Sequence, residues 1–548
     1  MDRNATSRRT AAFGCVVAAA LVGAVPARAQ QPAADAGLYR LYQGTAELGR
    51  ESFRRSATAL ESSMVLPVLS LRMTCRTEFD SAGHVARFEL RAYSLATDSL
   101  SVAYTAVAAG DSLHLDQTRS GPTPQARQWT KAGVVDAFSA PQTVAGLMAL
   151  VDRAHHRDTT FRAWGVGEDS VISVAVTFAG DTARVVSGPF ELRALLGPSG
   201  LAQSADIPVQ RVHIERWAGG DSLPPLAGLH RPPPDYSAPA GAPYTAEEVR
   251  VPVRPAVGDT FSLAGTLTLP KSGHAPYPAA VMITGSGLED RDENLWPLVQ
   301  GYRPFRQIAE RLARAGIAVL RVDDRSFGGS GGSARDATTE DFAGDVAAEV
   351  AWLRARPGID GRRIALIGHS EGGVIAPMVA AKDPRVAAIV MMAGTAKPGV
   401  QVLLDQSLGP IERDTDLSPE RRTELEAQAR RAVVADTASG SPWLRWFRSY
   451  DPLPTARRVR QPVLILQGAV DRQVSAGQAD TLAAAMRSAG NRDVTERVFP
   501  HLNHLFLFSP TDGSFSEYPA LKDTSIPNSV LDTMADWLAA RLVRGRGR

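Results

Sequence analysis

The chain has 548 residues, of which 44% are hydrophobic and 22% are charged. This length suits two or three domains, and this composition excludes a broadly disordered chain. The formal net charge of +2 gives no reason to expect a nucleic-acid partner or binding to an anionic membrane. After the first thirty residues, no stretch stays apolar for the roughly 18 residues of a membrane-spanning helix.

The first 29 residues have the features of an export signal. A basic start, an apolar run and an A-x-A cleavage site follow one another: Arg3, Arg8 and Arg9, then residues 11–25, then Ala27-Arg28-Ala29. A buried N-terminal helix is the alternative, but this order favours a signal peptide over residues 1–29. The arginine pair at 8 and 9 also hints at the twin-arginine route. We therefore expect an exported protein, either periplasmic or secreted.

Cysteine usage limits the chemistry of the mature chain. Cleavage after residue 29 would remove Cys15 and leave Cys75 alone, so no internal disulfide could form. A single cysteine with scattered histidines also argues against a structural zinc site. We expect neither a metal nor an organic cofactor.

Residues 30–220 have the texture of an antiparallel β domain. Alternating residues 69–74 and 85–93 flank a turn at 80–83, which predicts a hairpin. One helical stretch, residues 144–154, interrupts the strands. We expect a curved sheet or partial barrel, smaller than the domain that follows it, and we find no site chemistry in it. The pair His155-His156 fits a solvated surface better than a metal site.

A proline-rich linker over residues 221–243 marks the domain boundary. Beyond it, from 244 to 548, strands and helices alternate. Short apolar runs predict buried strands at 266–269, 279–283, 318–322, 364–367, 388–392, 462–467 and 494–499. The alternation predicts an α/β fold with a mostly parallel sheet covered by helices on both faces.

Residues 397–458 interrupt this alternation between two strands and look helical. Ser418-Pro419-Glu420 is a good helix start, and Trp443, Trp446 and Phe447 cluster near its end. An insertion at this point lies above the carboxyl ends of the strands, where open α/β sheets bind ligands. We therefore expect a helical cap that shapes a substrate pocket.

The segment Gly368-His369-Ser370-Glu371-Gly372 follows a predicted strand and precedes a predicted helix. This is the nucleophile-elbow pattern in the context that it requires. The sharp turn raises the serine hydroxyl above the sheet, and the helix N-terminus behind it favours negative charge. Ser370 is the candidate nucleophile.

A serine hydroxyl needs a base and an orienting acid, which follow it in the chain order of this fold. Asp471 comes just after the strand at 462–467 and is the candidate acid, although a loop aspartate that caps the next helix would look the same. Two histidines, His501 and His504, follow the last strand and compete for the role of base.

The oxyanion needs two preorganised donors. One is expected to be the backbone N–H of Glu371, which follows the nucleophile. The other is expected from the glycine-containing loop after the strand at 279–283, at Ser286 or at its neighbour Gly285. The side chain of Glu371 has no role in this scheme.

Two charged loops flank the predicted site. Asp290-Arg291-Asp292-Glu293 follows the oxyanion loop, and Asp323-Asp324-Arg325 follows the next strand. We expect these charges to pair with each other and brace the site rather than to contact substrate.

These motifs together resemble a bacterial α/β-hydrolase esterase family, near its dienelactone-hydrolase and prolyl-oligopeptidase-like branches. The resemblance runs from about residue 245 to the end and rests on Gly285-Ser286-Gly287, Asp290-Arg291-Asp292, Asp323-Asp324-Arg325, Gly368 to Gly373, Asp451-Pro452, Gln467-Gly468 with Asp471, and Asn503-His504-Leu505-Phe506. It implies hydrolysis of small carboxylic esters, with short or medium acyl chains, by Ser370, Asp471 and His504. The context of His504 is the usual one in this family, which favours it over His501.

Two alternatives to an esterase remain. A serine peptidase or aminopeptidase would use the same triad, but the region before 244 is too short for the propeller of true prolyl oligopeptidases. An envelope ligand-binding protein with an inert hydrolase domain is of a different class, and the complete triad argues against it.

Overall fold

The computed structural model describes residues 35–543, with gaps at 44–45, 67–70, 82–83, 95–99, 111, 120–124, 133–135, 140–142, 166–170, 188–189, 198–199, 208–211, 218–234, 296–297, 335, 416 and 436–441. The predicted signal peptide and most of the predicted linker therefore lie outside the described residues. No helix within the described ranges is both long and apolar enough to cross a membrane.

The described strands of the N-terminal region form one sheet of fifteen strands. The strands are β1 (Asp35–Gln43), β2 (Ala46–Arg55), β3 (Ala59–Leu66), β4 (Leu71–Phe79), β5 (Val85–Ser94), β6 (Leu100–Ala109), β7 (Ser112–Arg119), β8 (Gln125–Ala132), β9 (Ala137–Ser139), β10 (Thr159–Gly165), β11 (Val171–Ala179), β12 (Thr182–Ser187), β13 (Phe190–Leu196), β14 (Ala202–Ile207) and β15 (Val212–Arg216). All neighbouring pairs are antiparallel except β9 with β10, and β1 pairs with β15 to join two meanders. The expected hairpin is β4 with β5. This sheet has more strands than the second one, although its region of the chain is shorter, as expected.

The helix α1 (Val144–Arg153) packs against this sheet, and its apolar side chains share one core with the strands. A carboxylate from the sheet meets its N-terminus: Glu51 Oε2 accepts hydrogen bonds from the backbone N–H groups of Val144 at 2.6 Å and Ala145 at 3.1 Å. Burial raises the pKa of Glu51 to about 7, although these hydrogen bonds act to lower it.

Because its folded-state pKa exceeds the usual 4.5, Glu51 contributes stability that is full below pH 4.5 and is lost as the pH rises to about 7. We expect Glu51→Gln to remove this dependence. The difference in unfolding free energy between wild type and variant should change by roughly 3 kcal/mol between pH 4.5 and pH 8, as measured by urea unfolding. The matched control is Glu61→Gln, an exposed position on β3, which should leave the dependence unchanged.

The second sheet has eight strands in the order β16-β17-β19-β18-β20-β21-β22-β23. They are β16 (Tyr244–Val253), β17 (Phe261–Pro270), β18 (Tyr277–Ile283), β19 (Ala318–Val322), β20 (Ile359–His369), β21 (Ala388–Met392), β22 (Val463–Gly468) and β23 (Val494–Phe499). In this spatial order, the strands from β19 through β18 to β23 run parallel to one another. The strands β16 and β17 lie at one edge and pair antiparallel. A mostly parallel sheet is what alternating strands and helices predict.

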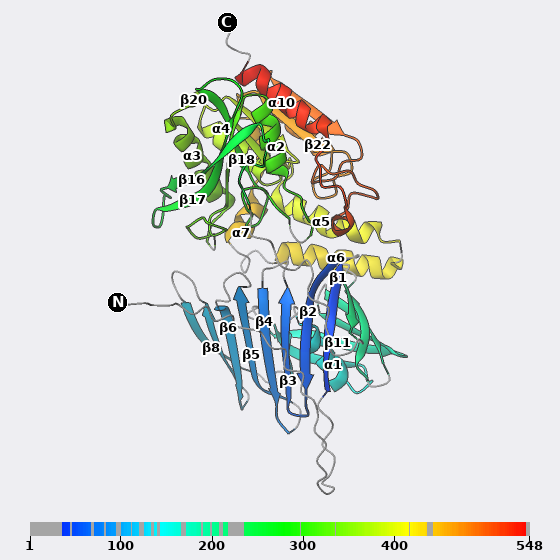
Figure 1. Ribbon diagram of the computed structural model, residues 1–548. Coiled ribbons are helices and arrows are strands. Elements are labelled where there is room, and N and C mark those ends of the chain that lie inside the picture. The colour runs from blue at the N-terminus through cyan, green and yellow to red at the C-terminus, as the bar shows by residue number, and fades with distance from the viewer. Residues whose placement is uncertain are drawn as a thin grey trace, which may run out of the picture.

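Helices cover both faces of this sheet (Figure 1). The helices α3 (Thr339–Ala355), α4 (Gly372–Lys382) and α9 (Gly477–Ser488) share one core with Ile364 and Leu366 of β20. The helices α2 (Pro304–Arg314) and α10 (Asn528–Leu542) share the other core with Ala365 and Ile367. Both faces of β20 are therefore apolar because both are buried.

The segment between β21 and β22 forms a helical cap, as its sequence predicts. It contains α5 (Gly399–Arg413), α6 (Pro419–Ala435), α7 (Pro442–Ser449) and α8 (Pro452–Ala456). Figure 1 shows α6 between the second sheet and the N-terminal sheet, and Arg421 of α6 forms an ion pair with Glu191 of β13. The cap thus contacts both units.

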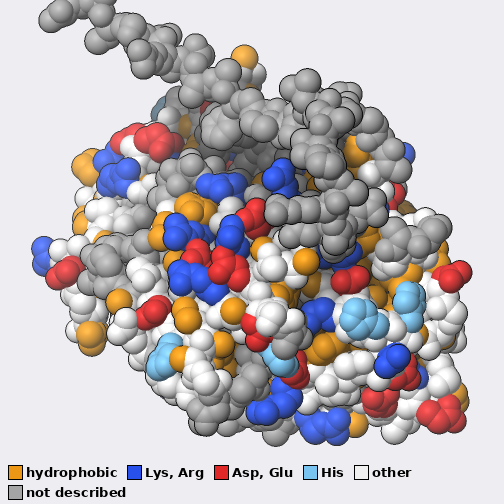
Figure 2. Space-filling model, turned by 90° about the horizontal axis from the view of Figure 1, so that it is seen from below, with side chains coloured by type: hydrophobic (Ala, Val, Ile, Leu, Met, Phe, Trp, Pro, Cys, Tyr) orange, Lys and Arg blue, Asp and Glu red, His pale blue; other side chains and the backbone are white. Residues whose placement is uncertain are grey.

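Charges of both signs are interspersed on the molecular face at the N-terminal sheet. Figure 2 shows blue and red side chains side by side there, without a large region of one sign among the coloured atoms. This pattern gives no electrostatic case for a polyanionic partner at that face.

Candidate active site

Ser370 lies at the turn between β20 and α4 with a φ of +52°. Such a backbone conformation is strained for a residue with a side chain and is found at functional turns. The turn closes tightly, because a Cβ on Gly368 would lie 1.9 Å from the carbonyl oxygen of Gly372. The N–H of Ser370 donates to the Met392 carbonyl at 2.8 Å, which ties the turn to β21. The local structure is the nucleophile elbow predicted from the glycine pattern.

Asp471 and His504 lie together at the carboxyl ends of the neighbouring strands. His504 Nδ1 is 2.8 Å from Asp471 Oδ2, and both side chains are buried. The other carboxylate oxygen, Oδ1, accepts from the backbone N–H groups of Gln473 and Val474 at 2.8 and 2.9 Å. Gln467 Nε2 also donates to Oδ2 at 2.8 Å. Asp471 is thus held rigidly, with one oxygen aimed at the imidazole, in the arrangement that orients a general base.

His501 occupies a different environment from His504. It is exposed, and its ring lies against Phe508 at 6.1 Å between centroids. The structure therefore brings His504, and not His501, to the carboxylate of Asp471.

The oxyanion loop lies beside Ser370. A Cβ on Gly285 would be 3.4 Å from Ser370 Cβ, so the loop backbone approaches Ser370 closely. The Gly285 N–H donates to Glu293 Oε1 at 2.9 Å, so it is not directed at a substrate oxygen. Ser286 lies in the wall of the same cavity as Ser370. Of the two expected donors in this loop, the geometry favours Ser286.

A cavity of about 60 Å³ lies at Ser370 beneath the cap. Its wall mixes polar with apolar and aromatic side chains, and it is lined by Ser286, Ser370, Glu371, Val374, Thr395, Val402, Leu403, Gln406, Trp443, Phe447 and Val474. Trp443 and Phe447 of α7 stack with centroids 5.3 Å apart. The aromatic part of this wall suits an apolar substrate group.

The side chain of Glu371 has a role that the sequence pattern did not indicate. Its Oε1 accepts from Trp443 Nε1 at 2.8 Å and from Thr339 Oγ1 at 2.5 Å. Burial raises the pKa of Glu371, although these two hydrogen bonds act to lower it. The residue after the nucleophile thus attaches the cap helix α7 to the start of α3. No local signal could reveal a contact between residues 72 positions apart.

The charged loops pair with each other, as expected. Arg291 donates to both oxygens of Asp323, at 3.0 and 2.9 Å, and all of these atoms are buried. Asp324 accepts from Thr284 Oγ1 at 2.8 Å and from the Glu289 N–H at 2.9 Å. The loop that contains Asp323 and Asp324 is therefore hydrogen-bonded to the loop that follows β18.

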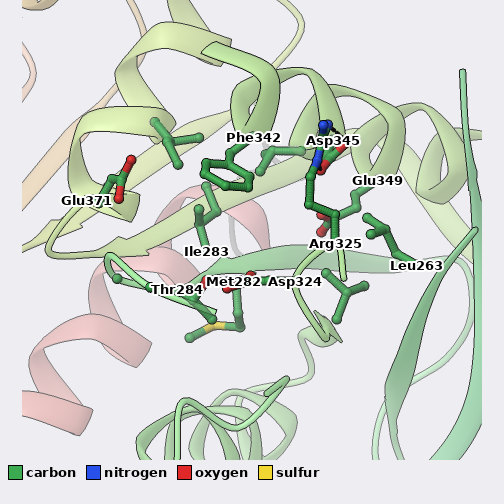
Figure 3. Close-up of a pocket in the computed structure, with 15 residues that line it drawn as sticks. Leu263, Met282, Ile283, Thr284, Asp324, Arg325, Phe342, Asp345, Glu349 and Glu371 are labelled. Atoms are coloured by element: carbon green, nitrogen blue, oxygen red, sulfur yellow. Dashed lines mark hydrogen bonds and ion pairs between the residues drawn. The ribbon is translucent and has the colours of Figure 1, made fainter. Parts of the chain in front are cut away.

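A second cavity, of about 40 Å³, shares Glu371 and the loop after β18 with the first (Figure 3). Figure 3 shows Glu371 at one end, Phe342 in the middle, and Glu349 near the paired Arg325 and Asp345 at the other end. Burial, together with the charges of neighbouring acids, raises the pKa of Glu349 well above its usual value. Burial also raises the pKa of Asp324 to about 7. These carboxyl groups are thus biased toward their neutral forms. Among the described residues, no cluster of His, Cys, Asp and Glu is arranged to hold a metal ion.

The parallel sheet, the turn at Ser370 and the cap give the C-terminal unit the α/β-hydrolase fold. Comparison with known proteins agrees: residues 299–511 match the family described as serine aminopeptidase, S33. The chain is 30% identical to the esterase EstD of Thermotoga maritima over 287 residues, which are 50% of this chain and 65% of EstD. It is 29% identical to dipeptidyl aminopeptidase BIII of Pseudoxanthomonas mexicana over 280 residues, 48% of this chain and 37% of that protein. The chain thus spans less than two thirds of either relative.

Among solved structures, the esterase Pf2001 of Pyrococcus furiosus is similar, with 16% identity, coverage of 57% of this chain and 97% of that chain, and a TM-score of 0.39. By sequence, the chain is thus similar to an esterase and to a dipeptidyl aminopeptidase, and part of it matches the serine aminopeptidase family.

Proposed function

We propose that the chain is a carboxylic ester hydrolase that works through an acyl-enzyme on Ser370. The observation that carries this proposal is the hydrogen-bonded pair of His504 and Asp471. The His504 ring packs against His369, the residue before Ser370, and Ser370 lies on a strained turn in the wall of a cavity. The similarity to the esterase EstD supports the same substrate class.

The reaction is a two-step acyl transfer. His504 Nε2 takes the proton of Ser370 Oγ, which attacks the ester carbonyl carbon. The tetrahedral oxyanion accepts hydrogen bonds from the backbone N–H groups of Glu371 and Ser286. The alcohol leaves with the proton from His504, and water then attacks the acyl-enzyme with the same base. Asp471 holds the imidazole tautomer and stabilises its cation.

The stacked pair of Trp443 and Phe447 supports an apolar acyl group as the part of the substrate that enters the cavity. We expect Trp443→Phe to keep the aromatic wall but lose the hydrogen bond to Glu371. The variant should raise KM for hexanoyl and octanoyl esters by about tenfold, since a lost hydrogen bond of this kind costs roughly 1.5 kcal/mol, and change kcat for acetyl esters little. Steady-state kinetics over a p-nitrophenyl ester series would check this, and an equal effect on all chain lengths would contradict it.

The experiment that tests the function compares p-nitrophenyl esters with aminoacyl p-nitroanilides, using the chain from residue 30 onward. Labelling by a fluorophosphonate reports a competent nucleophile independently of substrate choice. Ester hydrolysis with labelling supports the proposal. Labelling with hydrolysis of anilides alone would make the chain a peptidase.

The aminopeptidase alternative draws on the family match and on the dipeptidyl aminopeptidase. An aminopeptidase needs a carboxylate to bind the substrate amine. Among the described residues that line the cavity at Ser370, Glu371 alone carries a carboxylate, and its Oε1 is engaged by Trp443 and Thr339. This favours the esterase.

We further propose that the chain is exported to the periplasm or secreted, on the basis of the signal-like residues 1–29. Mass spectrometry of the N-terminus of the protein from a periplasmic extract would test this, with a start at Gln30 as the expected result. A ligand-binding protein with an inert hydrolase unit would instead fail to react with the fluorophosphonate.

A further inference from the structure

His369, the residue before the nucleophile, is buried beneath the active site and makes two hydrogen bonds. Its Nδ1 lies 2.8 Å from Glu293 Oε1, and its Nε2 lies 2.9 Å from the carbonyl oxygen of His504. The ring also packs against the His504 ring, with centroids 4.9 Å apart. His369 thus contacts both the backbone and the side chain of the predicted base.

Glu293 links this histidine to the oxyanion loop. The same Oε1 atom that faces His369 accepts the N–H of Gly285 at 2.9 Å. Gly285 directly precedes Ser286, whose N–H is the proposed oxyanion donor. Glu293 itself is buried and has a φ of +55°, a strained conformation that persists only where surrounding contacts hold it.

The chemistry of these partners determines the protonation of His369. A carbonyl oxygen can only accept, so Nε2 carries a hydrogen. Nδ1 faces a carboxylate oxygen that already accepts from Gly285, so it also donates. Burial acts to lower the pKa of His369, but the charge and hydrogen bond of Glu293 and the His504 carbonyl raise it above its usual value. Both ring nitrogens of His369 therefore face acceptors, which favours the imidazolium form beside Glu293.

We propose that His369 and Glu293 are positioning residues that fix the distance between the oxyanion donor at Ser286 and the base His504. The inference rests on the proposed triad. One buried ion pair at the end of β20 joins three segments that are distant in sequence, namely the elbow, the oxyanion loop and the loop of the base. Catalysis is sensitive to such spacing, because oxyanion donors act only when they are aimed at the developing charge.

The variants Glu293→Gln and His369→Gln test this inference. Each keeps the side-chain size nearly unchanged but removes one member of the ion pair. We expect kcat for p-nitrophenyl acetate to fall by about 10- to 100-fold, with KM changed by less than about threefold, because the interaction acts on the transition state. The rate of fluorophosphonate labelling should fall in parallel. The double variant should lose no more than the stronger single variant, since the two residues act as one unit.

The matched control is Gln461→Leu. Gln461 is buried at the opposite end of the sheet, where its Nε2 donates to the carbonyls of Ala380 at 2.8 Å and Asp383 at 3.1 Å. This variant should lower the unfolding temperature but leave kcat unchanged. A kcat within about twofold of wild type in either single variant would overturn the inference. The inference would also be overturned if Glu293→Gln, His369→Gln and Gln461→Leu all lost kcat in proportion to the fall in their unfolding temperatures. A wild-type chain that neither hydrolyses esters nor labels would instead contradict the proposed function itself.

Discussion

Replacing Ser370 with alanine is expected to abolish ester hydrolysis, with a loss of about 10⁶-fold in kcat. The reason is that Ser370 is the proposed nucleophile, on which the acyl-enzyme forms. The fold should survive, because the side chain of Ser370 is only partly buried and the turn is held by its backbone N–H to Met392. The measurement is hydrolysis of p-nitrophenyl acetate at high enzyme concentration, beside a thermal unfolding scan.

A matched control for this variant is Ser529→Ala, at an exposed position near the start of α10. It should keep full activity and full fluorophosphonate labelling, whereas Ser370→Ala should lose both. If Ser370→Ala kept more than about one hundredth of the wild-type rate, Ser370 would not be the nucleophile.

Buried strands were predictable because a parallel strand that is covered on both faces appears in the sequence as a continuous apolar run. The run at residues 364–367 is apolar on both faces, and it lies inside β20. The elbow was predictable for a related reason, since only glycine fits where Gly368 meets the backbone of Gly372. These features are local, because the residues that make contact are only a few positions apart in the sequence.

The extent of the N-terminal sheet was not predictable in the same way. Alternation along β4 indicates a strand with one buried face, but it does not tell which strands are neighbours. The pairing of β1 with β15 joins residues near 40 to residues near 214 and has no signature in either segment. The sequence therefore predicts the kind of sheet better than its size.

The polar contacts around the active site were the least accessible from sequence. Glu371 contacts Trp443 across 72 positions, and His369 contacts Glu293 across 76. Each depends on the finished fold, because only the packed sheet brings strand ends and cap together. The two charged loops were expected to pair because their sequences carry charges of both signs and buried charges require partners.

Replacing Asp471 with asparagine carries the second large expected effect, a loss of about 10⁴-fold in kcat. Backbone donors from Gln473 and Val474 hold Oδ1, so an asparagine would keep its oxygen at that position and point its amide N–H₂ toward His504. The imidazole would then accept at Nδ1 and carry its hydrogen on Nε2, the wrong tautomer for a base that must take the proton of Ser370.

The structure also explains why this variant should remain folded. The Asp471 carboxylate accepts hydrogen bonds but has no buried ion pair other than with His504 among the described residues. A matched control is Asp360→Asn near the start of β20, far from the site, where the carboxylate accepts from Arg363 at 2.7 Å. This control should keep wild-type kcat. If Asp471→Asn retained a tenth or more of the wild-type rate, the loop aspartate would be a structural cap, and the orienting acid would have to be another residue.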